Sequence, residues 1–300
     1  MSQVTSGTGA DVDRKQIVAK VMGDISHIAT LPEITIKIIE TVEDPDACAE
    51  DLHKIIANDP ALCARVLKVV NSAFYGLPGQ IGSINRAIVL LGLNAVKNIA
   101  IAASLAKLFR GGKLCDSFNA RDLWNHSTAV AAGVKLLTER LKVSMLDESF
   151  LAGLMHDIGI MVEMQAIQPK LIEVFDVMAE KNIPMVEAEE QVIGANHQDF
   201  GRALAEKWKF PASFSFVAGF HHDPMQLSHE QRALPCIVHV ADILAARMKI
   251  GFTGTVSSLE IDPEVLDELQ LTESVIQQIL DDLPEAHQVA EQMLSPGAAA

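Results

Sequence analysis

One stretch of the sequence, ESFLAGLMHDIGIM at residues 148–161, constrains the interior of any fold that this chain adopts. Its apolar residues recur at the three- and four-residue spacing of a helix that faces a core, which predicts a buried helix over about 147–165. His156 and Asp157 stand side by side in the middle of this pattern, flanked by Gly153 and Gly159. An unpaired carboxylate among apolar side chains costs roughly several kcal/mol. The fold must therefore supply Asp157 with a positive charge or with hydrogen-bond donors.

The rest of the chain shows helical rather than strand periodicity. In DPALCARVLKVVNS, for example, Asp59 is placed as an N-cap and Pro60 occupies the first helical position, where its missing N–H is not needed. Gly92 is a stop signal between two further helical segments. No alternating strand pattern appears, and only 5% of the residues are aromatic while 49% are hydrophobic, a balance that favours packed helices. We predict an all-α, multi-helical protein in two parts.

The clearest interruption of the helical pattern is RGGKLCDSFNA, residues 110–120, where two glycines and several polar residues occur together. We therefore expect an N-terminal helical bundle over residues 13–115 and a second helical domain over residues 116–294. The polar residues 1–12 are expected to be a disordered N-terminus, and residues 295–300 a tail.

Charge and composition exclude several classes of protein. The formal net charge of −15 argues against a general nucleic-acid binder, which needs a basic surface. The chain opens without the apolar segment of a signal peptide, and its apolar windows are too short to span a bilayer. Its four cysteines form no C-x-x-C pair, which favours reduced thiols. We expect a cytoplasmic protein with no membrane partner.

The second half of the chain is rich in histidine and aspartate. His126 lies in a segment with many small residues, and Gly153 is small too, so two such helices can approach closely and bring His126 against the doublet. Taken singly, each ionisable residue has a structural explanation: a buried histidine can be satisfied within the core, and Asp242 can pair with Arg247 or cap a neighbouring element. Taken together they form an ordered set of imidazoles and carboxylates: His126, His156, Asp157, His197, His221, His222 and Asp242.

Imidazole and carboxylate are ligands of divalent metals such as iron, manganese and zinc. A bound cation would neutralise Asp157 and Asp242 in place. The remaining histidines considered occur in amphipathic or charged contexts that indicate a surface position: His27, His53, His229 and His287.

The order of His126, the His156–Asp157 doublet and Asp242 resembles the signature of the HD superfamily of metal-dependent phosphohydrolases. His197 and the His221–His222 pair resemble the dinuclear subset, particularly the HD-GYP cyclic dinucleotide phosphodiesterases. The first half contains VNSAFYG followed by IGSINRAIVLLG, a run similar to that of the HDOD (HD-related output domain) family. The resemblance covers roughly residues 17–250.

This resemblance implies a helical signalling protein with an intact dinuclear metal site, and a metal-dependent phosphohydrolase or phosphodiesterase activity. Two divalent ions are implied, iron or manganese being favoured over zinc, nickel or magnesium. Asp157 would bridge them and act catalytically, and Asp122 could add a further carboxylate. The ligand would be a phosphate-containing small molecule or a nucleotide. HD-GYP proteins continue the doublet as H-D-I-G-K, whereas this chain has Ile160 in place of the lysine and no G-Y-P loop, which argues against hydrolysis of cyclic di-GMP.

Two alternatives remain open at the level of sequence. One is a non-catalytic signal-output module that binds a signalling protein and holds a structural or sensory metal. The other is a helical protein without metal, whose polar cluster satisfies itself through hydrogen bonds. A phosphate-binding enzyme also needs a cationic group, and the sequence does not choose among its candidates: Lys170, Lys181, Arg202 and Lys207.

Overall fold

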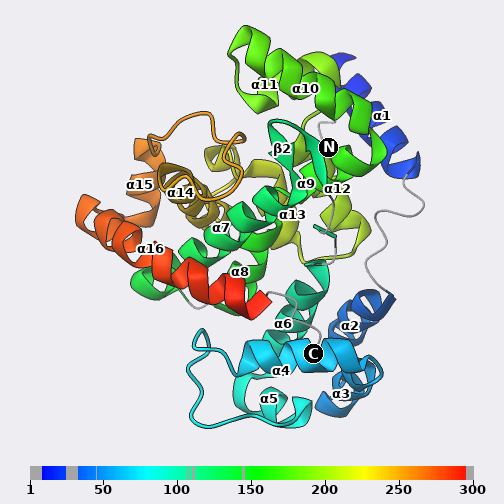
Figure 1. The fold of residues 1–300 in the computed structure, drawn as a ribbon, viewed down its shortest axis with the longest axis vertical. Helices are drawn as coiled ribbons and strands as arrows, with labels where there is room; N and C mark the ends of the chain where they lie inside the picture. The colour runs from blue at the N-terminus through cyan, green and yellow to red at the C-terminus, as the bar shows by residue number, and fades with distance from the viewer. Residues whose placement is uncertain are drawn as a thin grey trace, which may run out of the picture.

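The computed structural model describes residues 9–24, 33–44, 46–106, 108–109, 112–143 and 146–294. The all-α prediction is confirmed for these residues (Figure 1). The helices of the N-terminal part are α1 (Gly9–Asp24), α2 (Glu33–Glu43), α3 (Ala49–Ala57), α4 (Pro60–Val70), α5 (Ile84–Leu91) and α6 (Leu93–Leu105). Those that follow are α7 (Ala120–Leu141), α8 (Leu146–Met155), α9 (Ile158–Ala166), α10 (Gln168–Lys181), α11 (Met185–Val192), α12 (His197–Lys207), α13 (Ala212–Phe220), the 3₁₀ turn η1 (Pro224–Gln226), α14 (Ala233–Arg247), α15 (Pro263–Leu269) and α16 (Glu273–Leu294).

Helices α2–α5 surround α6, most of whose residues are buried. The predicted start of α4 is confirmed, because the side chain of Asp59 accepts a hydrogen bond from the Leu62 N–H and Pro60 is the first helical residue. Gly92, with φ of +88°, separates α5 from α6. This left-handed conformation favours glycine, so a single residue ends one helix and starts the next.

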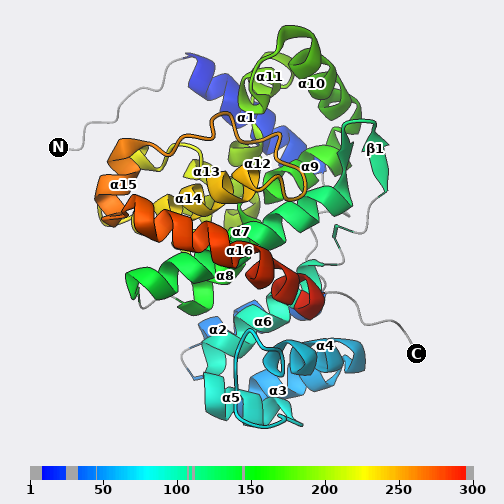
Figure 2. The same ribbon diagram turned by 60° about the vertical axis from the view of Figure 1, so that its left-hand side comes forward.

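Helix α7 is the centre of the larger group of helices and packs against α8, α14 and α16 (Figure 2). Its small residues allow the close approach to α8 that the sequence predicts. A Cβ atom added to Gly153 would lie 3.0 Å from the Cα of Ala131, so the two backbones meet with almost no side chain between them. This contact places the C-terminal end of α8, and hence the His156–Asp157 doublet, beside α7.

Helix α1 lies against α12, away from α2–α5 (Figure 1). Arg14 pairs with Glu190 at 2.8 Å and with Asp199 at 3.3 Å, and Lys207 donates a hydrogen bond to the Met22 carbonyl. The helix starts at Gly9, inside the segment expected to be disordered, because these contacts and buried apolar residues attach it to α12. Residues 1–8 and the predicted tail lie outside the described residues. The proposed domain limits at 13–115 and 116–294 stay a prediction, since α6 also contacts α8 and α4 contacts α16.

The interruption at 110–120 contains a short antiparallel hairpin of β1 (Lys113–Cys115) and β2 (Phe118–Asn119), which the helical pattern did not predict. Phe118 is buried at this point and stacks on Phe175, with 5.2 Å between ring centroids. Its ring also meets Phe252 edge to face. Aromatic packing from distant parts of the chain therefore holds this hairpin in place.

Within the described ranges, no helix taken alone has the length and apolar composition needed to cross a membrane. The segments Glu148–Ala166 and Gln168–Lys181 reach that length and composition only as a pair, bent by 115° at the break between them.

Candidate metal centre

The His156–Asp157 doublet lies in a break between two helices, not inside one helix over 147–165 as the sequence pattern predicted. Helix α8 ends at Met155 and α9 begins at Ile158. Neighbouring side chains on a continuous helix point about 100° apart. The break lets both side chains face the same place, with 3.3 Å between His156 Nε2 and Asp157 Oδ2.

Gly159 fits α9 against the start of α12. A Cβ atom at Gly159 would lie 1.8 Å from the carbonyl oxygen of His197 and 2.7 Å from the N of Gly201. Both atoms belong to the backbone, so no flexible side chain could move aside. The absence of a side chain at Gly159 therefore allows α12 to bring His197 close to the doublet.

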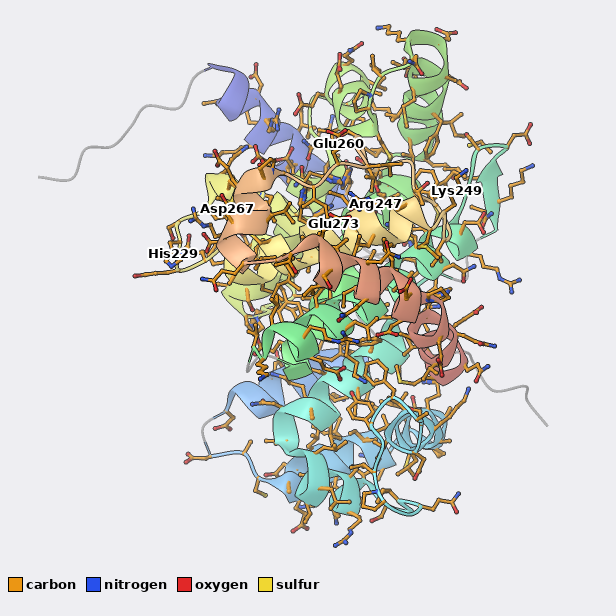
Figure 3. The ribbon with its side chains drawn as sticks, turned by 90° about the vertical axis from the view of Figure 1, so that its left-hand side faces the viewer. His229, Arg247, Lys249, Glu260, Asp267 and Glu273 are labelled. Atoms are coloured by element: carbon orange, nitrogen blue, oxygen red, sulfur yellow. The ribbon has the colours of Figure 1, made fainter. Side chains whose placement is uncertain are left out.

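Asp242 joins the doublet from α14. Its Oδ1 atom lies 2.8 Å from His126 Nε2, which comes from α7, and 3.8 Å from His156 Nε2. His126 also contacts the carbonyl oxygen of Ile250 through Nδ1, at 3.2 Å. Arg247 donates instead to the Leu259 carbonyl, and its side chain is seen on the face shown in Figure 3. The alternative in which Asp242 pairs with Arg247 is therefore wrong.

The remaining histidines approach the other side of Asp157. Its Oδ1 atom lies 3.2 Å from His221 Nε2 and 3.6 Å from His197 Nε2. His222 completes this side, with its Nε2 atom 3.0 Å from that of His197. The structure thus brings together residues from α7, the α8–α9 break, α12, the end of α13 and α14. We call the following set the metal cluster: His126, His156, Asp157, His197, His221, His222 and Asp242.

Chemically, the metal cluster fits divalent ions. Its residues form three overlapping groups of three or four. Within each group, every residue offers one nitrogen or carboxylate oxygen, and all these atoms lie within 4.8 Å of one another. Asp157 belongs to two of these groups, one with His126 and His156 and one with His197, His221 and His222. Three of its buried atoms have no hydrogen-bond partner: His156 Nε2, Asp157 Oδ1 and His221 Nε2.

Unsatisfied buried polar atoms cost about 1–3 kcal/mol each, and a shared cation would satisfy all three. A buried cluster of imidazoles and carboxylates is consistent with metal binding.

The electrostatics of the metal cluster suit metal ligands. Burial alone would lower the pKa of His156, but the carboxylates of Asp157 and Asp242 raise it to about 9. Burial alone would raise the pKa of each carboxyl, yet the histidines around them lower it, to about 2 for Asp242. Burial lowers the pKa of His221, and burial with neighbouring imidazoles lowers that of His222 further. Near neutral pH the structure therefore offers the ionised carboxylates of Asp157 and Asp242 and the neutral imidazoles of His221 and His222, the forms in which these groups bind metals. His156 keeps its proton beside the two carboxylates, and a bound cation would displace that proton.

Glu189 and His239 contact members of the metal cluster, Glu163 interacts electrostatically with Glu189, and none of the three was singled out from the sequence. Fully buried Glu189 lies 2.9 Å from His197 Nδ1 through its Oε2 atom. Glu163 is also fully buried, and burial raises the pKa of both carboxyls well above the usual value. His239 contacts the His221 carbonyl through Nδ1, at 2.8 Å. Glu163 stands alone in the apolar run GIMVEMQAI, a detectable signal, whereas Glu189 lies among other acids.

Asp122, which the resemblance suggested as an additional ligand, does not join the metal cluster. It is exposed at the N-terminus of α7, where its side chain accepts a hydrogen bond from the side chain of Asn119. It belongs to none of the potential metal-binding groups found among the described residues. The carboxylate of Asp122 therefore serves the start of α7.

A cleft of about 500 Å³ reaches the metal cluster from the surface, and we call it the main cleft. It lies between α11, α12, the end of α13 and the loop that follows α14, and it includes His222, Thr255 and Arg202. His222 is the most exposed member of the metal cluster, at 18% of its side chain. Thr255 donates a hydrogen bond to Asp157 Oδ2 at 3.2 Å. The floor of the main cleft is therefore in contact with the metal cluster.

Comparisons with known proteins identify the family and the fold. The sequence profile of the HDOD domain matches residues 28–224. The fold is similar to that of an HDOD domain protein of unknown function from Geobacter sulfurreducens, with a TM-score of 0.78 and 25% identity over 94% of this chain and 99% of that one. It is also similar to a Shewanella amazonensis SB2B protein provisionally described as a phosphohydrolase, with a TM-score of 0.71 and 21% identity over 92% of this chain and 97% of that one.

Among curated proteins, the chain is 26% identical over 254 residues to an uncharacterised protein of Treponema pallidum (strain Nichols). That alignment covers 84% of this chain but 47% of the relative, so the chain spans about half the length of the curated protein that it matches. Because the profile match includes most of the chain, the family assignment predicted from the sequence is confirmed. The chain belongs to the HDOD domain family.

Proposed function

We propose that the metal cluster binds two divalent ions and that the chain hydrolyses an organic phosphate in the main cleft. Iron or manganese is favoured by the donor set, and zinc, nickel or magnesium are alternatives. The observation that carries the proposal is the position of Asp157. Its Oδ1 atom lies 3.2 Å from His221 Nε2, and its Oδ2 atom lies 3.3 Å from His156 Nε2. The two oxygens of one carboxylate therefore face the two halves of the donor set, as a bridging ligand would.

Bound divalent ions would supply positive charge to the phosphoryl group and would acidify water near it. The chain's own residues orient the ligands. Thr255 fixes Asp157 through Oδ2, and the Ile250 carbonyl contacts His126 Nδ1. Glu189 contacts His197 Nδ1 at 2.9 Å through Oε2, and this contact orients the ring so that Nε2 lies on the side of Asp157. The proposed catalytic residue is Asp157.

The main cleft suits a small organic phosphate, for example a nucleotide, since ligand sites commonly measure about 300–1,000 Å³. Ile160, which replaces the lysine of HD-GYP proteins, is fully buried in α9. No cation is available at that position, which supports a substrate other than cyclic di-GMP.

The test is metal analysis of protein purified without chelator and without a nickel column, followed by assays with p-nitrophenyl phosphate and bis(p-nitrophenyl) phosphate. We expect about two ions per chain and hydrolysis of at least one of the two compounds. Asp157→Asn should lose both metal and turnover, whereas Asp176→Asn, which changes an exposed acid on α10, should retain both. Equal metal content and equal rates for wild type and Asp157→Asn would refute the assignment.

A second candidate function, a non-catalytic signal-output module, is favoured by one observation. On α5, Val89 is 73% exposed and Leu90 is 40% exposed, and exposed apolar side chains are suited to a protein partner. In this case the metal would be structural or sensory. Metal at full occupancy without turnover of either phosphoester would favour this alternative.

A further inference from the structure

The structure distinguishes among the cationic side chains that the sequence left equivalent. Lys170 donates to the Val192 carbonyl, Lys181 donates to the Gln191 side chain, and Lys207 donates to the Met22 carbonyl. None of these lysines lines the main cleft, whereas Arg202 does. Arg202 is therefore the one of the four candidates that could meet a ligand in this cleft.

Arg202 belongs to α12, and its side chain packs against the end of α13. Its side-chain carbons pass over Gly219, where an added Cβ atom would lie 3.1 Å from Cδ. Its guanidinium lies over the ring of Phe220, 5.6 Å from the centroid. Gly219 and Phe220 come directly before His221 and His222 of the metal cluster. The same helix end therefore positions both the guanidinium and two metal-cluster histidines.

The charge of Arg202 is balanced outside the main cleft. Its Nε atom lies 3.1 Å from Glu206, with side chains 50% and 57% exposed, and Glu206 does not line the main cleft. Arg14, the other arginine of the lining, pairs with Glu190 and Asp199, which both line the cleft themselves. Exposed ion pairs contribute roughly 0–1 kcal/mol, so Arg202 can exchange Glu206 for a ligand at little cost. Among the described lining residues, Arg202 is thus the cation without an acidic partner in the cleft.

We propose that Arg202 binds a second anionic group of the ligand, so that the main cleft selects organic phosphates carrying two separated negative charges. This inference rests on the proposed function, in which the first phosphoryl group lies at the metal cluster beside His222. The planar guanidinium can donate two parallel hydrogen bonds to a phosphate or carboxylate. The other acids of the lining, Glu187 and Asp223, accept hydrogen bonds from glutamine side chains. Because glutamine is uncharged, these two carboxylates keep their negative charge. They disfavour an anion that contacts neither the metal cluster nor Arg202.

The experiment compares adenosine 3′,5′-bisphosphate with adenosine 5′-monophosphate by calorimetric titration of manganese-loaded protein. A charge-assisted bond of the expected strength corresponds to about 10–100-fold in affinity, so wild type should bind the bisphosphate at least about tenfold more tightly. Arg202→Gln should remove this preference, and Arg202→Lys should retain part of it, because lysine keeps the charge but loses the planar geometry. Lys181→Gln, which removes an exposed cation outside the cleft, is the matched control and should bind like wild type.

Metal content, measured on the same samples, should be unchanged in Arg202→Gln. Equal preference for the bisphosphate in wild type and Arg202→Gln would overturn the proposal, as would the absence of any preference in wild type. Failure of the proposed function would appear in a different assay, the hydrolysis of p-nitrophenyl phosphate. This compound carries a single phosphoryl group, so its turnover does not require a contact with Arg202. A protein that binds the bisphosphate through Arg202 but hydrolyses nothing would support the binding role alone.

Discussion

Gly159→Ala tests whether the contact between α9 and α12 builds the metal cluster. The new Cβ atom would lie 1.8 Å from the His197 carbonyl oxygen, and ordinary contact begins near 3.4 Å, so the helices must separate locally by about 1.6 Å. Overpacking of this kind costs about 1–3 kcal/mol. We expect the upper end, because both atoms that meet the methyl group belong to the backbone. For a chain of this size, about 3 kcal/mol lowers the midpoint of thermal unfolding by roughly 6–12 °C.

The same movement would pull His197 away from Asp157. Since metal–ligand distances tolerate only about 0.2 Å, the affinity for manganese should fall at least about tenfold. Circular dichroism would follow thermal unfolding, and calorimetric titration would follow metal binding. Gly82→Ala is the control, because nothing lies within 4 Å of an added Cβ atom there, and it should change stability by less than about 0.5 kcal/mol. If Gly159→Ala unfolds and binds manganese as wild type does, the close approach of α9 and α12 is not what positions His197.

Three further predictions concern other parts of the molecule. Glu189→Ala should weaken manganese binding by about 10–100-fold in calorimetric titration, and Glu189→Gln should weaken it less, because the amide oxygen can still accept the histidine proton. The hydrogen bond from Arg232 holds the pKa of Glu268 below its usual value, so this pair should stabilise the folded protein above the usual glutamate pKa and lose that contribution as the pH falls through the folded-state pKa. Urea unfolding of wild type and Glu268→Gln should therefore differ at pH 7, and the difference should shrink as the pH falls below the usual glutamate pKa. Burial raises the pKa of Cys236 to about 12, so mass spectrometry after iodoacetamide treatment at pH 8 should find exposed Cys48 modified and Cys236 modified only after unfolding.

The pH prediction depends on contacts at the edge of α15. His229, which Figure 3 shows beside this helix, lies 2.9 Å from the second oxygen of Glu268. Its side chain is 79% exposed, so water screens its charge and its contribution is small. A difference between wild type and Glu268→Gln that grew below pH 4 would contradict the assigned role of Arg232.

Local signals in the sequence determined the helices of this protein. The N-cap at Asp59, the stop at Gly92 and the apolar spacing around the doublet each act within a few residues, so one short window contains the whole signal. The break at His156–Asp157 escaped prediction for a related reason. The residues after the break pack against α12, whose first residue lies 40 positions after Asp157, and no window around the doublet contains that partner.

The sequence alone also predicted the residues of the metal cluster, because histidines and aspartates are conspicuous in apolar helices. Only the tertiary structure decided which atoms meet, that Glu189 supports His197, that Asp122 stays outside, and that Arg202 faces the main cleft. Ligand geometry depends on distances of a few ångströms between helices, and those distances follow from packing partners far apart in the chain, such as Gly159 against the His197 carbonyl. The type of each residue can be read directly from the sequence. Which side chains meet depends on how distant helices pack in the interior.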